Sequence, residues 1–317
     1  MLDTLRADRM QIYGHKRKTT PYLKRHAQDF LRFANVEAVA PWTVPNHSTM
    51  FTGLWPAEHK AQWGRIFLRD EFDTLAEILR GAGFATAALS ANPFVAEKFG
   101  FGQGFDEFRR IKGTWYKKTQ KILDMIPKTV DDALERQDRF FLFVNVMDAH
   151  IPYNTKRYGK AFGVSDSGPA SDYKVKWEIN AGKRPFTDGD KQTNQAAYDA
   201  AVRYLDDVVR DVLKIFERKG LLKKTVFVFT SDHGDGLGFH PEIGHEISVW
   251  EEQLRVPLIA RLPNRRHGGE VFRPRTTLAA LAPTVLDWLG VERPEQLRER
   301  PDLWEAASQP VTADYRS

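Results

Sequence analysis

The chain has 317 residues, of which 42% are hydrophobic and 28% charged, and its mean hydropathy is -0.49. This composition excludes an extended disordered chain, and the length fits one large α/β domain or two modest ones. The chain contains no cysteine, which excludes disulfides, thiolate metal ligands and a cysteine nucleophile.

The net charge is +5, and the basic residues are spread along the chain, with local clusters at 15–18 and 265–267. No nucleic-acid-binding motif accompanies these clusters, so we interpret them as solvated surface and expect no nucleic-acid partner. A mildly positive protein attracts anionic esters. No apolar run approaches the ~18 residues that span a bilayer, and the N-terminus lacks a signal-peptide pattern. As written, the chain is expected to be cytoplasmic without a membrane segment; an export signal or anchor in a missing upstream segment remains an alternative.

Asp3 opens a polar N-terminal segment, and if it ends a first strand, that strand is absent from the sequence. A capping residue and a proline in the first turn predict a helix at 20–33, followed by a short strand at 36–40. Thr43 then lies in a turn before a short helix at 48–53. The free amides of a helix N-terminus favour anions, so this turn is a candidate anion site.

The rest of the chain alternates predicted helices and strands, which is typical of α/β proteins. The helix at 198–216 has the clearest apolar spacing of three and four residues, and residues 139–147 form a continuous apolar run typical of a central strand. Between them, residues 154–190 are polar without periodicity, which predicts a long insertion or mobile lid. The other predicted elements are helices at 73–80, 119–135 and 277–289 and strands at 84–90, 225–230 and 256–260.

Side chains that can bind a metal follow two of these strands. Asp232 and His233 come directly after one predicted strand, and Asp148 and His150 come after another. In open α/β sheets ligands bind beyond the carboxyl ends of the strands, and a carboxylate beside an imidazole suits a divalent cation. The alternative interpretation is a surface loop with a chance Asp-His pair.

Five motifs occur in one order along almost the whole chain: LDTLRADR, APWTVPNHSTMFTGLWPAEH, TSDHGDGLG, VPLIARLP and LAALAPTVLDWLG. Together they resemble the sulfatase branch of the alkaline phosphatase superfamily. The resemblance implies an α/β fold with a mixed, mostly parallel central sheet sandwiched between helices, and with metal and nucleophile at the strand ends. We expect a single catalytic domain over 1–317 with a long insertion around 154–190. Loss of the first strand and loss of a C-terminal subdomain are both considered.

By motif, the resemblance implies that Asp3, Asp232 and His233 bind the metal and that Thr43 is the nucleophile and also contacts the metal. A divalent cation lowers the pKa of a hydroxyl, holds an anionic ester and offsets charge on the transferring oxygens. Because Asp3 is followed by a threonine rather than a second aspartate, one ion is favoured over two. Asp148 and the histidines after the strand ends are the candidates for a second ion.

The nucleophile motif departs from the family pattern. Sulfatases carry Cys or Ser within C/S-x-P-x-R, matured to formylglycine, whereas this chain has Thr43-Val44-Pro45-Asn46-His47. Threonine cannot form that aldehyde, so a formylglycine sulfatase is disfavoured. Threonine is similar instead to the nucleophile of phosphodiesterases and of phosphoglycerol or phosphoethanolamine transferases in the same superfamily, which form a phosphothreonine intermediate.

Other polar residues are candidates for the site, and each has a structural alternative. His245 or His150 is expected to protonate the leaving group, and His47 replaces the family arginine at the anionic oxygens. Asn92 is expected to contact the substrate, although Asn-Pro is also a common turn. For His240, substrate binding and a structural role are both considered.

Four charged residues are interpreted as structural. Asp8 and Arg9 are expected to form a local ion pair. Asp206 and Asp207 lie on the helix at 198–216 and are expected to be surface charge.

The sequence therefore predicts a metal-dependent hydrolase or transferase of phosphate or sulfate esters, with phosphodiesters favoured and a covalent threonine intermediate. The cofactor is expected to be one or two divalent ions of zinc, manganese, calcium or magnesium. The expected partner is a small anionic ester, and the oligomeric state is left open. Two alternatives remain: a sulfatase that works without formylglycine, and an anion-binding pseudoenzyme or fragment without turnover.

Overall fold

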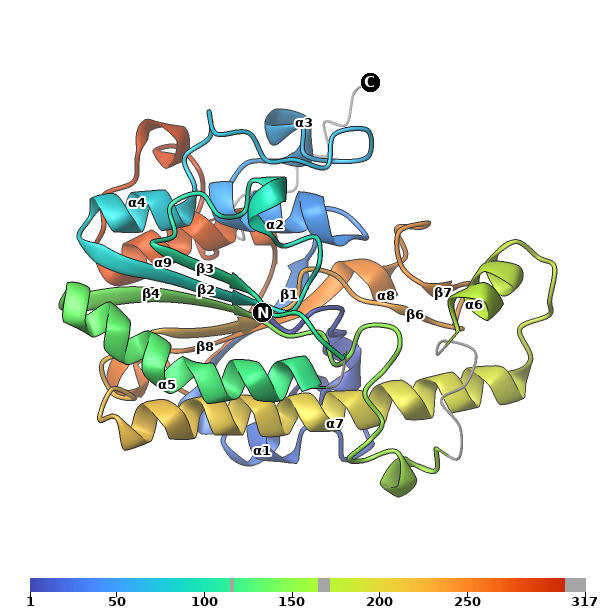
Figure 1. The fold of residues 1–317 in the computed structure, drawn as a ribbon. Coiled ribbons are helices and arrows are strands. Elements are labelled where there is room, and N and C mark those ends of the chain that lie inside the picture. The colour runs from blue at the N-terminus through green and yellow to red at the C-terminus, as the bar shows by residue number, and fades with distance from the viewer. Residues whose placement is uncertain (115–116, 165–171, 306–317) are drawn as a thin grey trace.

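A computed structural model describes residues 1–114, 117–164 and 172–305. Its central sheet lies between two layers of helices (Figure 1). One layer contains α2 (Thr43–Thr52), α4 (Leu75–Gly81) and α9 (Leu281–Leu289), and the other contains α1 (Pro21–Arg25), α5 (Lys118–Arg136) and α7 (Asp188–Arg218). Shorter helices are α3 (Pro56–His59), α6 (Tyr173–Asn180) and α8 (Glu251–Leu254). No helix in these ranges is both long and apolar enough to span a bilayer.

The sheet consists of two parts that meet at the N-terminal segment. The first part has the order β3-β2-β4 and is parallel, with strands Glu107–Arg110, Phe84–Ser90 and Arg139–Asn145. The second has the order β5-β8-β1-β9, with strands Phe227–Thr230, Arg255–Arg261, Leu31–Glu37 and Val271–Thr277. Here β8 is antiparallel to both neighbours, and β1 is parallel to β9. The predicted α/β fold with a mixed, mostly parallel sheet is therefore confirmed.

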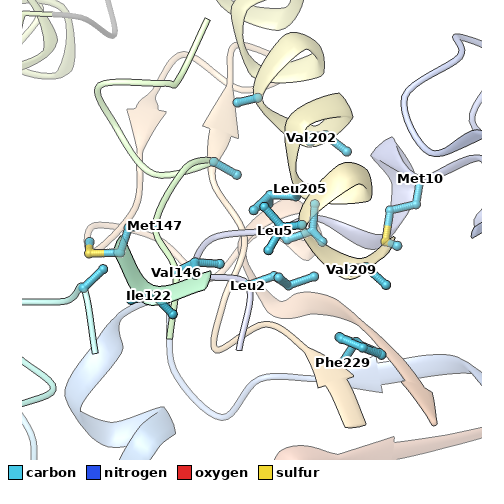
Figure 2. Close-up of a cluster of buried hydrophobic side chains, with 14 of the residues drawn as sticks. Leu2, Leu5, Met10, Ile122, Val146, Met147, Val202, Leu205, Val209 and Phe229 are labelled. Atoms are coloured by element: carbon cyan, nitrogen blue, oxygen red, sulfur yellow. The ribbon is translucent and has the colours of Figure 1, made fainter. Parts of the chain in front are cut away.

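The N-terminal segment runs through the middle of the molecule. Leu2 forms a parallel bridge with Val146, just after β4, and its N–H donates to the carbonyl of Thr230 at the end of β5 at 2.8 Å. Figure 2 shows Leu2 and Leu5 packed among buried side chains of α7 and β5, and both are at most 4% exposed. This packing holds the polar residues between the two leucines in a fixed position at the carboxyl ends of β4 and β5.

Most other predicted elements are confirmed with small changes at their ends. Strand β2 has the predicted bounds, and β4, β5, β8 and α5 each start or end within two residues of the predicted positions. Helix α2 already begins at Thr43 and ends as predicted at Gly53, whose left-handed φ of 68° terminates the helix. A short hairpin of β6 (Gly236–Leu237) and β7 (Ile243–Gly244) follows β5.

The predicted helix at 20–33 is wrong beyond its first turn. Helix α1 ends at Arg25, and β1 begins at Leu31, earlier than the predicted strand. Leu31 and Phe33 are at most 2% exposed because β1 pairs with β8 on one side and β9 on the other. Pairing on both edges overrides the helical spacing that these apolar residues also satisfy.

The predicted insertion at 154–190 is more regular than expected. It contains α6 and the first turn of α7, which begins at Asp188 after a capping box in which Thr187 and Asp190 bond each other's backbone amides. The first turns of α7 are polar, so they carry no apolar spacing. Residues 165–171 of this stretch lie outside the described residues. The predicted helix at 277–289 starts later, at Leu281, after β9 and a short 3-10 turn.

The predicted pairing of two charged residues and the predicted surface position of two others are both wrong. Arg9 contacts Asp199 of α7 at 2.9 Å, and Asp8 pairs with a different arginine, so the predicted Asp8–Arg9 pair does not form. Asp206 and Asp207 are each only 1% exposed, so their predicted surface position is wrong. Asp206 accepts from backbone N–H groups of α1, and Asp207 accepts from the hydroxyl of Tyr158, so other parts of the chain cover this face of α7.

Candidate metal and nucleophile site

Thr43 is held at the first position of α2 by a buried asparagine. The side-chain oxygen of Asn46 accepts from the N–H of Val39 at 2.9 Å, and its amide nitrogen donates to the carbonyls of Ala40 and Trp42 at 2.6 and 2.8 Å. These bonds fix the turn between β1 and α2. Asn46 was not among the predicted site residues; the signal that could have found it is an asparagine in a turn, where its side chain commonly bonds nearby backbone.

Asp3 is tied to Asp232 by the backbone of Thr4. The N–H of Thr4 donates to Asp232 Oδ1 at 3.3 Å, and its hydroxyl donates to the carbonyl of Asp3 at 2.7 Å. Thr4 adopts a left-handed φ of 58°, which is uncommon for a β-branched residue. The next amide, of Leu5, donates to the hydroxyl of Ser231 at 2.8 Å. Two segments more than 200 positions apart are thus joined beside the two carboxylates.

Asp3, Asp232 and His233 form a buried trio whose potential ligand atoms all lie within 4.8 Å of one another. Each residue is 0% exposed. Asp3 Oδ1, Asp232 Oδ2 and His233 Nε2 have no hydrogen-bond partner among the described residues, and the last two atoms are 3.4 Å apart. Buried polar atoms are normally paired, so three unpaired ligand atoms that face one another fit a divalent cation.

The two carboxylates have opposite pKa shifts. Burial and the charge of Asp232 raise the pKa of Asp3. Burial also raises the pKa of Asp232, but the imidazoles of His233 and His47 outweigh it, and the pKa lies below its usual value. The trio therefore has one carboxylate that stays ionised and one that is costly to ionise without a cation beside it.

Two more predicted residues, Asn92 and His47, lie beside the trio, together with one that was not predicted. Asn92 donates to Asp3 Oδ2 at 2.7 Å and lies 3.5 Å from the Thr43 hydroxyl, so it joins the nucleophile candidate to the metal-ligand candidate. His47 Nδ1 lies 3.0 Å from the carbonyl of Thr43 and 3.6 Å from Asp232 Oδ2. Burial lowers the pKa of His47. Asn145, which was not predicted, also donates to Asp3 Oδ2 at 3.2 Å; a polar residue that ends an apolar strand was the available signal.

His245 and His150 lie next to the trio. The ring of His245 is centred 4.4 Å from that of His233 and 4.9 Å from that of His150. His245 Nδ1 lies 2.9 Å from Asp235 Oδ1, and Tyr153 donates its hydroxyl to Asp235 Oδ2 at 2.6 Å. Burial and the two neighbouring imidazoles hold the pKa of His245 well below its usual value. Asp235 and Tyr153 were not predicted, although Asp235 stands two residues after His233 and Tyr153 three residues after His150.

The structure does not bring Asp148 or His240 to the trio. The carboxylate of Asp148 accepts from Thr119 and, at 2.7 Å, from Asn154, and burial raises its pKa to about 6. His240 Nδ1 lies 3.1 Å from Glu252, and its ring stacks on Trp250 with centroids 3.9 Å apart. Among the described residues, both side chains therefore have local partners away from the unpaired ligand atoms.

The layered sheet, the helix that begins at a buried threonine and the carboxylate–imidazole trio at the strand ends define an α/β protein with an alkaline phosphatase-like fold. A family model described as Sulfatase matches residues 1–291. The chain belongs to the sulfatase family, as predicted.

The chain is similar to several characterised proteins over most of its own length. It is 32% identical to the multifunctional alkaline phosphatase superfamily protein PehA of Trinickia caryophylli, over 87% of this chain and 69% of the relative. It is 24% identical to an ulvan-active sulfatase of Formosa agariphila, over 98% of this chain. It spans 64% of that relative and 59% of an arylsulfatase K of Xenopus laevis, to which it is 22% identical over 87% of this chain.

Solved structures share the fold. The phosphonate monoester hydrolase of Agrobacterium radiobacter superimposes with a TM-score of 0.78 and 18% identity, covering 98% of this chain and 77% of the hydrolase. A protein bound to its substrate D-glucosamine-2-N,6-O-disulfate gives a TM-score of 0.75 and 19% identity, covering 100% and 81%. At these identities the likeness concerns the fold.

Proposed function

We propose that this protein hydrolyses or transfers phosphate or sulfate esters, with Asp3, Asp232 and His233 holding a divalent cation and Thr43 as the nucleophile. The observation that carries this proposal is the set of three unpaired, buried ligand atoms. Asn92 links one of their residues, Asp3, to the Thr43 hydroxyl through the other carboxylate oxygen. When bound, the cation supplies a positive charge that lowers the pKa of the hydroxyl and offsets charge on the ester oxygens. One ion is proposed, because the described residues form one such trio.

The residues around Thr43 support an anionic transition state. The first amides of α2 point their N–H groups toward the helix N-terminus, where they attract ester oxygens. In the proposed step Thr43 Oγ1 loses its proton to solvent and forms a bond to phosphorus or sulfur, while the bond to the leaving oxygen breaks and that oxygen takes up a proton. Water then attacks the phosphorus or sulfur, its oxygen departs with the released group, and a proton returns to Thr43 Oγ1. His47, which is buried next to Thr43, is proposed to stabilise these oxygens.

His245 is proposed to move the proton to the leaving oxygen. Asp235 and Tyr153 fix the orientation of its ring, and His150 packs against it. Burial lowers the pKa of the His245 imidazole, whereas the negative charge of an ester bound next to the ring raises it. The imidazole therefore takes up a proton as the substrate binds. We propose that the described residues together form a single catalytic domain.

Phosphodiesters are the proposed substrates, and sulfate esters are the second candidate. Thr43 favours phosphoryl transfer, because threonine does not mature to formylglycine. The family and the sulfatases among the relatives favour sulfate esters. The two substrate classes use the same nucleophile and cation here, so the substrate panel below decides between them.

The test is an activity panel on metal-stripped protein reloaded in turn with zinc, manganese, calcium or magnesium. Aryl phosphate monoesters, phosphodiesters, phosphonate monoesters and sulfates are compared. Thr43→Ala is expected to reduce turnover by about 10⁶-fold, the scale seen when a covalent nucleophile is removed. Thr43→Ser is the matched control, because it keeps a hydroxyl at the same position, and mass spectrometry is expected to find a phosphorylated residue 43.

Two results would contradict the proposal. Full activity of the Thr43→Ala protein would exclude the threonine nucleophile. A folded protein that takes up none of the four metals and turns over no substrate would favour the anion-binding alternative.

A further inference from the structure

Helix α6 lies beside the β6–β7 hairpin (Figure 1) and is fastened both to it and to the loop after β4. The side chain of Asn180 bonds both peptide groups of Ile243 in β7: its Nδ2 donates to the carbonyl and its Oδ1 accepts from the N–H, each at 2.9 Å. At the other end of the helix, Tyr173 donates its hydroxyl to the carbonyl of Ile151 at 2.9 Å. The residues between these two anchors are therefore held in place beside the segment that carries His245.

Lys176 lies between the two anchors, and the end of its side chain reaches Gly244, the residue before His245. Gly244 has a left-handed φ of 87°, and a β-carbon placed on it would lie 2.5 Å from Lys176 Cε and 2.6 Å from Nζ. Any side chain at position 244 would displace the ammonium group, so glycine both permits the turn and leaves room for the lysine. The ammonium therefore lies next to the backbone of the proposed proton donor.

The half-buried side chain of Lys176 makes no hydrogen bond or ion pair within the part of the chain that the structure describes. Burial raises the pKa of the nearby carboxyl of Asp235, and the bond from Tyr153 and the charge of Lys176 act against burial. Both oxygens of Asp235 are already engaged, one by Tyr153 and the other by His245. An ammonium group has three N–H donors, so one without an acceptor here fits a negatively charged group that a ligand supplies.

The position of Lys176 assigns it to the leaving-group side of the ester. The ring of His245 is centred 4.4 Å from that of His233, and Lys176 lies against the residue that precedes His245. In an in-line displacement the leaving oxygen stands opposite the nucleophile Thr43 and faces the proton donor. A group attached beyond that oxygen is therefore the part of a substrate that comes to Lys176, while the transferred phosphorus or sulfur stays beside Thr43.

Glu246 carries an opposing charge at the same place. Its carboxylate lies 3.8 Å from His245 Nε2, and its side chain is 44% exposed, whereas Lys176 is half-buried. Water and salt screen an exposed charge more strongly than a partly buried one. Glu246 therefore offsets only part of the attraction that Lys176 exerts on an anion.

We propose that Lys176 forms an anion subsite beyond the scissile bond, which takes a carboxylate, sulfate or phosphate group carried by the leaving group of the ester. The inference rests on the proposed function, because it assigns another part of the same site. It narrows the substrate class to esters that carry a second negative charge on the leaving side. The subsite is supplied by α6, so it depends on the stretch between β4 and α7 rather than on the metal and nucleophile motifs.

The test uses aryl phosphodiesters and aryl sulfates whose leaving phenol carries a meta carboxylate, sulfonate or phosphonate, each compared with the neutral meta carboxamide. Lys176→Met keeps the length of the side chain and removes its charge. It is expected to lower kcat/KM for the charged esters by at least about tenfold, the scale of a hydrogen bond to a charged group, and to change the carboxamide ester by less than about twofold. The order of the three charged esters identifies the anion that the subsite prefers.

Lys174→Met is the matched control on the same helix. The side chain of Lys174 is 81% exposed, and its Nζ lies 3.9 Å from Glu178. Its loss is expected to change kcat/KM for every ester by less than about twofold, because an exposed ion pair contributes little. A charge preference that Lys174→Met lowers as much as Lys176→Met does would reflect the general charge of α6 and would overturn the subsite.

Binding separates this inference from the proposed activity. The same esters are titrated calorimetrically into metal-loaded Thr43→Ala protein with and without Lys176→Met. If the charged esters bind more tightly than the carboxamide ester only when Lys176 is present, the subsite stands even where the activity panel finds no turnover. Equal losses for charged and neutral esters in Lys176→Met would place Lys176 on the transferred group or in the support of α6, and unchanged values for all esters would leave it without a ligand. Either result would overturn the proposal.

Discussion

Two groups of buried carboxylates differ in how their charge is balanced. In the trio, Asp3 and Asp232 are 0% exposed and have unpaired oxygens. On α7, Asp199 is equally buried, but it contacts Arg9 at 2.9 Å and Arg17 at 2.8 Å. Burial and charge are the same in both groups, so neither identifies a site. The unpaired ligand atoms are what distinguish the trio from a structural ion pair.

The neighbouring aspartates of α7 show two further ways to satisfy a buried carboxylate. Asp207 lies between Arg203 and Arg210 at 2.9 and 2.6 Å. Burial raises its pKa, but the hydrogen bond from the Tyr158 hydroxyl and these two cations outweigh burial, so the pKa lies below its usual value. Asp206 instead accepts two backbone N–H groups at the start of α1, at 2.7 and 3.0 Å. Burial raises the pKa of Asp206 to about 6, because the two N–H groups and Arg203, which is 3.7 Å away, compensate the charge only in part.

The largest expected effect comes from neutralising the paired carboxylate. Asp199→Asn leaves two guanidinium groups without their buried partner, so the unfolding free energy of metal-free protein is expected to fall by about 3 to 5 kcal/mol in urea titration. Asp188→Asn is the control on the same helix, because Asp188 is exposed and its loss is expected to change less than about 0.5 kcal/mol. An Asp199→Asn protein as stable as the control would remove the distinction between the groups.

The second prediction makes the same replacement of aspartate by asparagine in the trio. Asp3→Asn is expected to raise the unfolding free energy of the metal-free protein at neutral pH, because burial and Asp232 penalise the charge of Asp3. Metal affinity is expected to fall by more than about 100-fold, since even the loss of a residue that only orients a ligand costs 10- to 100-fold. Titrations with and without a chelator measure both. A loss of stability in the metal-free Asp3→Asn protein would show that Asp3 is structural, like Asp199.

The sequence predicted the parts of this comparison that depend on local pattern. Asp232 and His233 follow an apolar strand, and a polar residue at such a strand end is visible from the sequence alone. The pairing of Asp199 was not predictable, because its partner Arg9 is 190 positions away and the contact depends on how the N-terminal segment crosses α7. For the same reason Asp206 was placed at the surface: helical spacing identifies a buried face, but not a second element that covers the polar side.

Asp148 tests the same comparison with a smaller expected effect, because the groups that donate to its carboxylate are neutral. Its raised pKa of about 6 means that its stabilising contribution is fully present below its unfolded pKa of ~4 and is lost as the pH rises through about 6. Asp148→Asn is expected to remove this pH dependence, which amounts to about 2 kcal/mol between pH 4 and 7. Thr119 can turn its hydroxyl to accept from the new amide. Unfolding titrations across this range measure the slope, and an unchanged slope in the variant would contradict the assignment.

The smallest expected effect concerns Asp235, which shares features of both groups. It is buried, and no arginine or lysine of the described residues forms an ion pair with it, yet both of its oxygens accept or face a donor. Tyr153→Phe removes the hydroxyl that donates to Asp235 Oδ2 at 2.6 Å and leaves the bond to His245 at 2.9 Å in place. The unfolding free energy is expected to fall by about 1 to 2 kcal/mol, the cost of one unsatisfied buried acceptor. If His245 moves the proton, kcat falls while KM changes little, because Tyr153 acts through the ring orientation and not on the ester. A loss confined to stability, with kcat unchanged, would make Asp235 a structural carboxylate of the kind found on α7.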